Sequence, residues 1–339
     1  MEFDPNNFAL HNKNFIGLPF EERNADLVLV PVPWDLTTSF RPGTSKAPRD
    51  ILEISYQLDL FDRDFPNHWE RGIWFAPVDL SIQQLNDTWR PQAKAHIDFL
   101  ESGKQLDQHA EALDRLQAIN EASVQLNEWV YQQTKTYLKA GKRVGLIGGD
   151  HSTPLGYYQA LAEIHGSFSI LQIDAHCDLR PAYEGFTYSH ASIMHQALQL
   201  DSIQRLHQIG IRDLSHAEFE IAQQHPKVHF HGMSDLRNGL LQGDSFDTLL
   251  DPILGSMEGP VYISFDIDGL DPVYCPATGT PVPGGLSYAQ ADYLIRKVAR
   301  NDFPIIGFDF VETGAHSIPD ANTAARLIYL LSLVCLDTI

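Results

Sequence analysis

Acidic and histidine side chains gather at three points of the sequence, and each group directly follows a short apolar run of the kind found in buried strands. The residues concerned are His151 in the first group, Asp174, His176 and Asp178 in the second, and Asp266 and Asp268 in the third. Alternate side chains at the end of a strand point the same way, so we expect each group to converge on one point. Four carboxylates can lie this close only where positive charge compensates them, and divalent cations are the natural compensation.

Six ligands of these types suit two metal ions that share bridging carboxylates. Carboxylate oxygens combined with imidazoles indicate Mn(II), or Fe, Ni, Co or Zn. Four aspartates balance the charge of two dications, and such a pair lowers the pKa of a bound water toward neutrality. A hydroxide bound between the two ions then makes the site negative by about one charge. The groups together therefore predict a hydrolytic site that accepts a small monocation. A solvated turn or a helix N-cap is the plain alternative for any one group taken alone.

Several other residues could in principle take part in chemistry, but we interpret them as structural. Cys177 lies between two predicted ligands, and we expect its thiol to pack in the interior. His229 and His231 alternate on a short strand without acidic neighbours and are interpreted as ordinary strand-end histidines. The glycine pair at 148–149 is not followed by the Gly-Lys-Ser/Thr sequence of a phosphate-binding loop.

The elements that must position these groups alternate between strands and helices. Apolar runs predict strands at 27–32, 144–147, 168–173, 206–211, 228–230, 261–265 and 305–310, and helices at 155–164, 288–298 and 322–336. Helical spacing between residues 105 and 140 predicts one long amphipathic helix or a helix pair, while the stretch 56–90 stays unassigned. This alternation indicates a parallel sheet covered by helices on both faces, with chemistry beyond the carboxyl ends of the strands.

Composition narrows the class of protein. We expect one domain over residues 1–339, with an N-terminal arm at 1–24 and an insert with a long helix at 60–140. A net charge of −20 argues against binding to nucleic acid or to anionic membranes and is compatible with a cationic small molecule. The sequence shows neither a signal peptide nor a membrane span, and its three cysteines do not make a disulfide framework, so we expect a cytoplasmic protein.

The three groups resemble the signatures of the ureohydrolase (arginase/agmatinase) family. The matching sequences are Gly-Gly-Asp-His-Ser at 148–152, Asp-Ala-His-x-Asp-x-Arg at 174–180 and Ser-Phe-Asp-Ile-Asp-Gly-Leu-Asp-Pro at 264–272. The resemblance implies an arginase-like three-layer α/β/α sandwich with a mainly parallel sheet. It also implies two divalent metal ions, usually Mn(II), with Ni(II) as the alternative. One ion would be held by His151, Asp174, Asp178 and Asp266, and the other by Asp174, His176, Asp266 and Asp268.

The same resemblance implies catalytic roles for three residues. Glu312 would grip a guanidinium group, Asp178 would hydrogen-bond the attacking hydroxide, and His190 would help to protonate the leaving amine. The implied reaction is hydrolysis of a guanidino C–N bond with release of urea, as in an agmatinase, and the implied assembly is a homo-oligomer, a trimer or a hexamer. Guanidine, guanidinobutyrate and formiminoglutamate are alternative substrates. A catalytically silent binding subunit and a deacetylase-like zinc enzyme are the alternatives from other classes.

Two features depart from the agmatinase pattern. Ala191 follows His190 where agmatinases usually have glycine, which leaves the substrate's tail open. The region 60–120 is longer than a plain agmatinase needs, and it could cover the site or form an oligomer contact.

Overall fold

The computed structural model describes residues 3–301 and 303–338. Its eight strands form one sheet in the order β2-β1-β3-β8-β7-β4-β5-β6, and every neighbouring pair is parallel. The strands are β1 Leu27–Pro31, β2 Ile73–Phe75, β3 Arg143–Ile147, β4 Phe168–Ile173, β5 Ile203–Ile209, β6 Val228–His231, β7 Val261–Asp266 and β8 Ile305–Val311. The predicted α/β class with a parallel sheet is confirmed.

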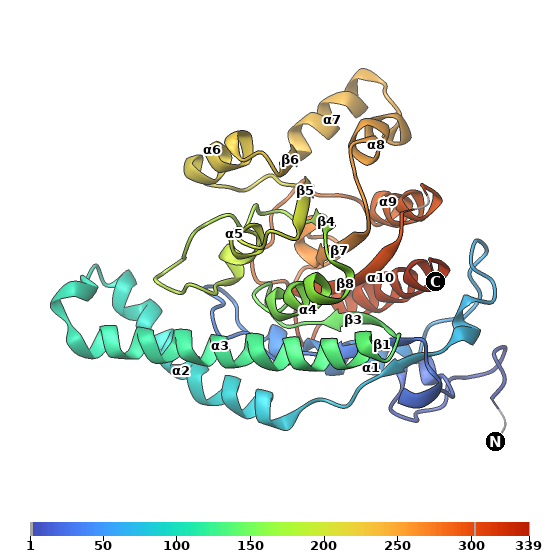
Figure 1. The fold of residues 1–339 in the computed structure, drawn as a ribbon, viewed down its shortest axis with the longest axis horizontal. Helices are drawn as coiled ribbons and strands as arrows, with labels where there is room; N and C mark the ends of the chain where they lie inside the picture. The colour runs from blue at the N-terminus through green and yellow to red at the C-terminus, as the bar shows by residue number, and fades with distance from the viewer. Residues whose placement is uncertain (1–2, 302, 339) are drawn as a thin grey trace.

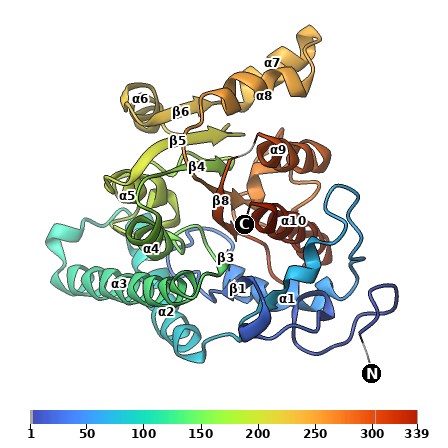
Figure 2. The ribbon, with the colours of Figure 1, turned by 45° about the vertical axis from the view of Figure 1, so that its right-hand side comes forward.

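Helices cover both faces of the sheet and complete the three layers, as Figures 1 and 2 show. The helices are α1 Ala47–Ser55, α2 Leu80–Glu101, α3 Ala110–Lys139, α4 Leu155–His165, α5 Ile193–Leu198, α6 His216–Gln224, α7 Met233–Gln242, α8 Phe246–Gly255, α9 Tyr288–Arg300 and α10 Ile318–Asp337. One apolar core lies between the sheet and α1, α7, α8, α9 and α10, and a second lies on the face covered by α2, α3, α4 and α5. Burying the sheet on both faces explains why its strands are continuous apolar runs rather than alternating ones.

The two central strands β7 and β8 are buried at every position. They carry Phe265 and Phe310 at paired positions of the sheet, and these rings stack with centroids 4.9 Å apart. Packing of this kind makes the middle of the sheet a rigid base for the loops that follow its strands.

The predicted strands are all present, although β5 begins three residues before its predicted start. For the region 105–140 the structure has α3 preceded by a 3₁₀ turn at Leu106–Gln108, and α2 comes before that turn. The unassigned stretch contains β2 and the first half of α2. In the N-terminal segment, Phe15 and Leu18 are buried in the first core. Among the described residues, none of the helices combines the length and apolarity needed to cross a bilayer.

Candidate metal centre and active site

Four neighbouring strands at the centre of the sheet deliver the candidate site. In sheet order they are β3, β8, β7 and β4. Asp266 ends β7, and the segments that follow the four strands carry His151, Glu312, Asp268 and the Asp174–Asp178 group. Carboxyl ends of parallel strands meet at one edge of a sheet, so side chains far apart in the sequence become neighbours there. The structure brings all six predicted metal ligands to this edge.

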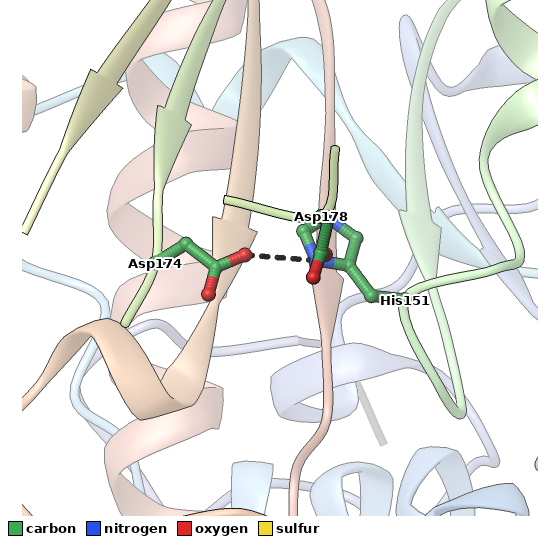
Figure 3. A group of neighbouring side chains, drawn as sticks. All are labelled: His151, Asp174 and Asp178. Atoms are coloured by element: carbon green, nitrogen blue, oxygen red, sulfur yellow. Dashed lines mark ion pairs between the residues drawn. The ribbon is translucent and has the colours of Figure 1, made fainter. Parts of the chain in front are cut away.

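His151 lies at the centre of the first group of ligands. Its Nδ1 is 3.0 Å from Asp174 Oδ2, 3.0 Å from Asp178 Oδ2 and 3.4 Å from Asp266 Oδ2. Figure 3 shows the imidazole of His151 pointing toward the carboxylates of Asp174 and Asp178. These three residues are buried and present ligand atoms within 4.8 Å of one another, close enough to hold one metal ion.

The other ring nitrogen of His151 identifies which of its atoms is free to bind a cation. Nε2 lies 2.9 Å from the hydroxyl oxygen of Ser264, and that hydroxyl donates to Asp309 Oδ1 at 3.1 Å. Because the Ser264 proton is used on Asp309, Nε2–H of His151 is the donor, and Nδ1 then presents a lone pair to the surrounding carboxylates. Nδ1 accordingly has no hydrogen-bond partner among the described residues. A lone pair facing carboxylate oxygens needs a cation between them, so these residues fit a bound metal.

A second group of ligands shares Asp174 with the first. Asp174, His176 and Asp268 also present ligand atoms within 4.8 Å of one another. Nδ1 of His176 is 3.1 Å from Asp268 Oδ2 and 3.6 Å from Asp174 Oδ1. Asp174 therefore lies between two groups, as a bridging carboxylate would.

The expectation that strand alternation aligns these side chains is wrong in its detail. β4 ends at Ile173, and Asp178 reaches the group because its backbone adopts the left-handed region with φ of 53°. Asp268 belongs to a 3₁₀ turn after β7 and donates its N–H to Asp266 Oδ1 at 2.8 Å. Loops rather than strands therefore shape the site, and the non-glycine positive φ of Asp178 costs about 1–3 kcal/mol of strain.

The crowding of charge shifts the pKa values of the acids. Burial, together with the charge of Asp174, raises the pKa of Asp178 to about 7. Burial and the charges of Asp268 and Asp174 raise the pKa of Asp266 well above its usual range. For Asp174, burial also favours the neutral form, but the neighbouring imidazoles of His151 and His176 outweigh it and keep the pKa below its usual value. Acids that resist ionisation together in this way indicate a site that lacks positive charge.

Glu312 and His190 form a pair beside the ligands. Glu312 follows β8 with a positive φ of 59°, and its Oε1 accepts the N–H of His151 at 3.0 Å. The same oxygen lies 3.3 Å from Nδ1 of His190. Burial opposes a charge on His190, but the hydrogen bond to Glu312 outweighs it and raises the pKa of the imidazole. Both residues line the same cavity as the predicted ligands.

Asp150 is a further buried acid of this region, and the sequence did not lead us to expect it among the residues of the site. Its Oδ1 accepts the N–H and the hydroxyl of Ser152, and its Oδ2 lies 3.3 Å from the Thr37 hydroxyl. Burial, followed by the charge of Glu312, raises the pKa of Asp150 to about 6. Its position beside His151 in the first signature was the signal that could have found it.

Further residues that the sequence reasoning missed hold the ligands in place. Gln172 donates to Asp174 Oδ2 at 2.8 Å, and Thr280 donates to Asp268 Oδ2 at 3.2 Å. Arg212 binds the backbone carbonyls of Asp268 and Leu270 at 2.7 and 3.0 Å, which fixes the turn after β7. Gln172 and Thr280 belong to the same chain segments as the ligands that they contact, whereas Arg212 follows β5 and reaches the turn after β7 from another strand.

Two residues flanking the site show why it can be so compact. A Cβ added at Gly149 would lie 1.6 Å from the carbonyl oxygen of Trp34, so only glycine allows these two backbones to meet.

Cys177 is fully buried, as expected, and burial raises the pKa of its thiol. A buried, protonated thiol is inert, which leaves the carboxylates and imidazoles as the reactive groups.

A cavity of about 180 Å³ opens over the ligands. Its deep end is lined by the ligand groups and by Glu312 and His190. Nearer the surface, the half-exposed guanidinium of Arg180 lies 4.7 Å from the ring centre of Tyr183 and pairs with Glu218 at 3.3 Å. Asp213 lies on the same wall with its carboxylate mostly exposed. The cavity therefore joins an acidic floor to an entrance that carries both charges.

Comparison with known proteins gives consistent matches. A family model described as the arginase family matches residues 25–334. The chain is 35% identical over 312 residues to an N(1)-aminopropylagmatine ureohydrolase of Thermus thermophilus, covering 92% of this chain and 90% of that protein. It is 29% identical to the agmatinase of Bacillus subtilis, covering 97% of each. The crystal structure of the agmatine ureohydrolase of Thermoplasma volcanium has the same fold, with a TM-score of 0.70 at 23% identity over 97% of this chain and 96% of that one.

Proposed function

The chain belongs to the arginase family, and from this premise we propose that it is a dinuclear metal-dependent ureohydrolase that cleaves the guanidino C–N bond of a cationic substrate to release urea and an amine. The observation that carries the proposal is the unpaired Nδ1 of His151, which faces carboxylates of Asp174 and Asp178 at 3.0 Å.

Six residues of the site would hold the metals. We assign His151, Asp174, Asp178 and Asp266 to one ion and Asp174, His176, Asp266 and Asp268 to the other, so that Asp174 and Asp266 would be shared; the contacts of Nδ1 of His151 and of His176 support this assignment. Carboxylates and imidazoles suit Mn(II), and Ni(II) is the alternative. When bound, the two ions would supply Lewis acidity and a water that ionises near neutral pH.

The chain's own groups would orient the substrate and move the proton. Glu312 uses Oε1 on His151 and His190, which leaves Oε2 to accept N–H groups of a guanidinium. The hydrogen bond to Glu312 raises the pKa of His190 and so favours the protonated imidazole, which would give a proton to the leaving amine. Asp178, whose Oδ2 lies 3.0 Å from Nδ1 of His151, would hydrogen-bond the attacking water.

The substrate is proposed to be a guanidino compound with a cationic tail, such as agmatine or its aminopropyl derivative. The relatives above act on these compounds by name, and the chain's net charge of −20 favours cations. Asp213 lies at the cavity entrance with no basic partner closer than Nε2 of His176 at 3.9 Å among the described residues, so it can receive a distal ammonium group. We also propose that the protein acts in the cytoplasm, since all three cysteines are free. A homo-oligomer is proposed as its assembly.

The test is a screen for urea release with Mn(II) or Ni(II) supplied to the metal-free protein. Agmatine and aminopropylagmatine are expected to yield urea, whereas arginine, guanidinobutyrate, formiminoglutamate and free guanidine are expected to be slower. Fast release from guanidinobutyrate or guanidine would keep the reaction and replace the substrate. Metal binding without turnover of any of these compounds would favour the silent binding subunit instead.

A further inference from the structure

The loop that carries His190 forms a tight hairpin before it reaches that residue. Tyr183 and Phe186 exchange backbone hydrogen bonds of 3.2 and 2.8 Å across a two-residue turn. Glu184 and Gly185 occupy the turn with φ of 54° and 83°, the conformation of a type I′ turn. Since Tyr183 and His190 both line the cavity, the position of this hairpin sets one wall of the site.

The side chain of Asn120 in α3 holds the far side of the hairpin. Its Nδ2 donates to the carbonyl of Gly185 at 3.2 Å, and its Oδ1 accepts the N–H of Thr187 at 3.0 Å. One amide group thus pairs with two backbone groups of the loop in the manner of a neighbouring strand. The contact is close, because a Cβ at Gly185 would lie 2.8 Å from Leu116 one turn earlier in the same helix.

His96 in α2 holds the tip of the same turn. Its side chain is completely buried, and its Nε2 lies 2.8 Å from the carbonyl oxygen of Glu184. A carbonyl only accepts, so Nε2–H is the donor. The ring of His96 also packs against Phe186 with centroids 5.1 Å apart.

The helix α2 braces a second loop that touches His190 from the other side. Asn86 donates to Asp35 Oδ1 at 3.0 Å and accepts the Asp35 N–H at 2.9 Å, and Arg90 donates to the carbonyl of Leu36 at 2.8 Å. The next residue, Thr37, accepts the N–H of His190 at 3.2 Å. The backbone of His190 is therefore held by its own loop, which α2 and α3 support, and by the 35–37 loop, which α2 supports. In Figure 1 these two helices run along the lower part of the molecule.

We propose that the α2–α3 pair is a clamp for the catalytic loop and that Asn120 is a positioning residue, which sets where His190 stands without touching the substrate. The role of His190 as the acid rests on the proposed function, whereas the clamping of residues 183–190 does not. Holding the catalytic loop would thus be the function of the long region before residue 140, which the sequence alone did not explain.

The experiment compares Asn120→Ala, Asn120→Asp and the control Gln117→Ala in the metal-loaded, full-length enzyme. Gln117 is exposed on the same helix one turn earlier and bonds only to Glu121 among the described residues, so its loss removes a side chain without touching the loop. Hydrogen–deuterium exchange of peptides covering 183–190, metal content, kcat and KM are measured for each variant.

For Asn120→Ala we expect faster exchange over 183–190 and a kcat about 10-fold lower, equivalent to about 1.4 kcal/mol, because both hydrogen bonds from this side chain to the loop are lost. Metal content and KM should stay within about two-fold, since none of the proposed ligands lies in the loop. Asn120→Asp keeps the acceptor for Thr187 and should restore protection of that amide and part of kcat. Unchanged exchange in Asn120→Ala, or equal change in Gln117→Ala, overturns the clamp. A wild-type protein that releases no urea refutes the proposed function, and the exchange result still decides the clamp.

Discussion

The imidazole of His151 donates through Nε2 to the hydroxyl of Ser264 across 2.9 Å, and this bond determines what its other nitrogen can do. Ser264 faces Asp309 across paired positions of β7 and β8 and donates to it. The two hydrogen bonds that link His151 to Ser264 and Ser264 to Asp309 thus keep Nδ1 of His151 unprotonated and directed at the carboxylates. A buried histidine is suited to bind a metal ion here because two neighbouring strands place a hydroxyl and an acid behind it.

Removing the Ser264 hydroxyl should weaken metal binding. Ser264→Ala leaves Nε2 of His151 without its acceptor, so the ring loses its fixed tautomer and we expect metal affinity to fall by about 10–100-fold. Titration of Mn(II) into the metal-free variant measures this change. Ser332→Ala removes another buried hydroxyl, in α10, and should bind metal as the wild type does. Equal affinities in the Ser264→Ala variant and the wild type would contradict the proposed role of this bond.

Neutralising Glu312 should separate substrate binding from metal binding. In Glu312→Gln the side chain can still accept the His151 N–H, but it loses the charge that would hold a guanidinium. A charge-assisted hydrogen bond contributes about 1.5–3 kcal/mol, so we expect kcat/KM to fall by about 10–100-fold with metal content unchanged. Metal analysis and steady-state kinetics on one preparation provide both values. Loss of metal from this variant would instead place Glu312 among the ligands.

Asp213 should distinguish substrates by their tails. Its exposed carboxylate can contribute at most about 1 kcal/mol to binding a distal ammonium, so Asp213→Asn should raise KM for aminopropylagmatine by no more than about five-fold. An alkylguanidine without a distal amine serves as the comparison and should keep its KM. If the KM values of both compounds rise together, Asp213 acts on the site as a whole and not on the tail.

A histidine cluster away from the site should make stability depend on pH. His229 and His231 of β6 stack on the fully buried His207 of β5, with ring centroids 4.6 and 6.2 Å from it, so they are more than ordinary strand-end residues. Burial and the neighbouring imidazoles lower the pKa of His207 to about 3, and burial and His229 lower that of His231 to about 4. The unfolded chain binds protons below about pH 6.5, and the folded cluster does not. Stability is therefore complete above about pH 6.5 and decreases as pH falls toward about 4.

Urea denaturation of the metal-loaded protein at about pH 7.5 and about pH 5 measures that loss of stability. His207→Leu should lose less stability between the two pH values than the wild type does, because one of the groups that resists protonation is gone. His216→Leu removes an exposed histidine and should behave as the wild type. The same pH dependence in His207→Leu and the wild type would rule the cluster out as its cause.

Local sequence patterns contain enough to predict the strands and the ligands that follow them. The apolar runs ending at Ile147, Ile173 and Phe265 are buried on both faces of the sheet, so the positions after them could be identified as the edge where chemistry occurs. The short helices α5, α6, α7 and α8 were not predicted. Each spans 6 to 10 residues, too few turns for a periodic apolar face to stand out.

The parts of the site that escaped prediction depend on long-range order. Strand order places β8 between β3 and β7, and only this order brings Asp309 next to Ser264 and Glu312 next to His151. The left-handed backbone of Asp178 likewise has no signature in its residue type. Residue types therefore indicated the candidate metal ligands, whereas their supporting partners appear only when the sheet is assembled.

The most direct test of the dinuclear site is a calorimetric titration of Mn(II) into the metal-free wild-type protein, with urea release from agmatine and aminopropylagmatine measured at each point. We predict two ions per chain and activity that appears as they bind. One ion per chain or fewer, or urea release that persists after complete chelation, would contradict the dinuclear site.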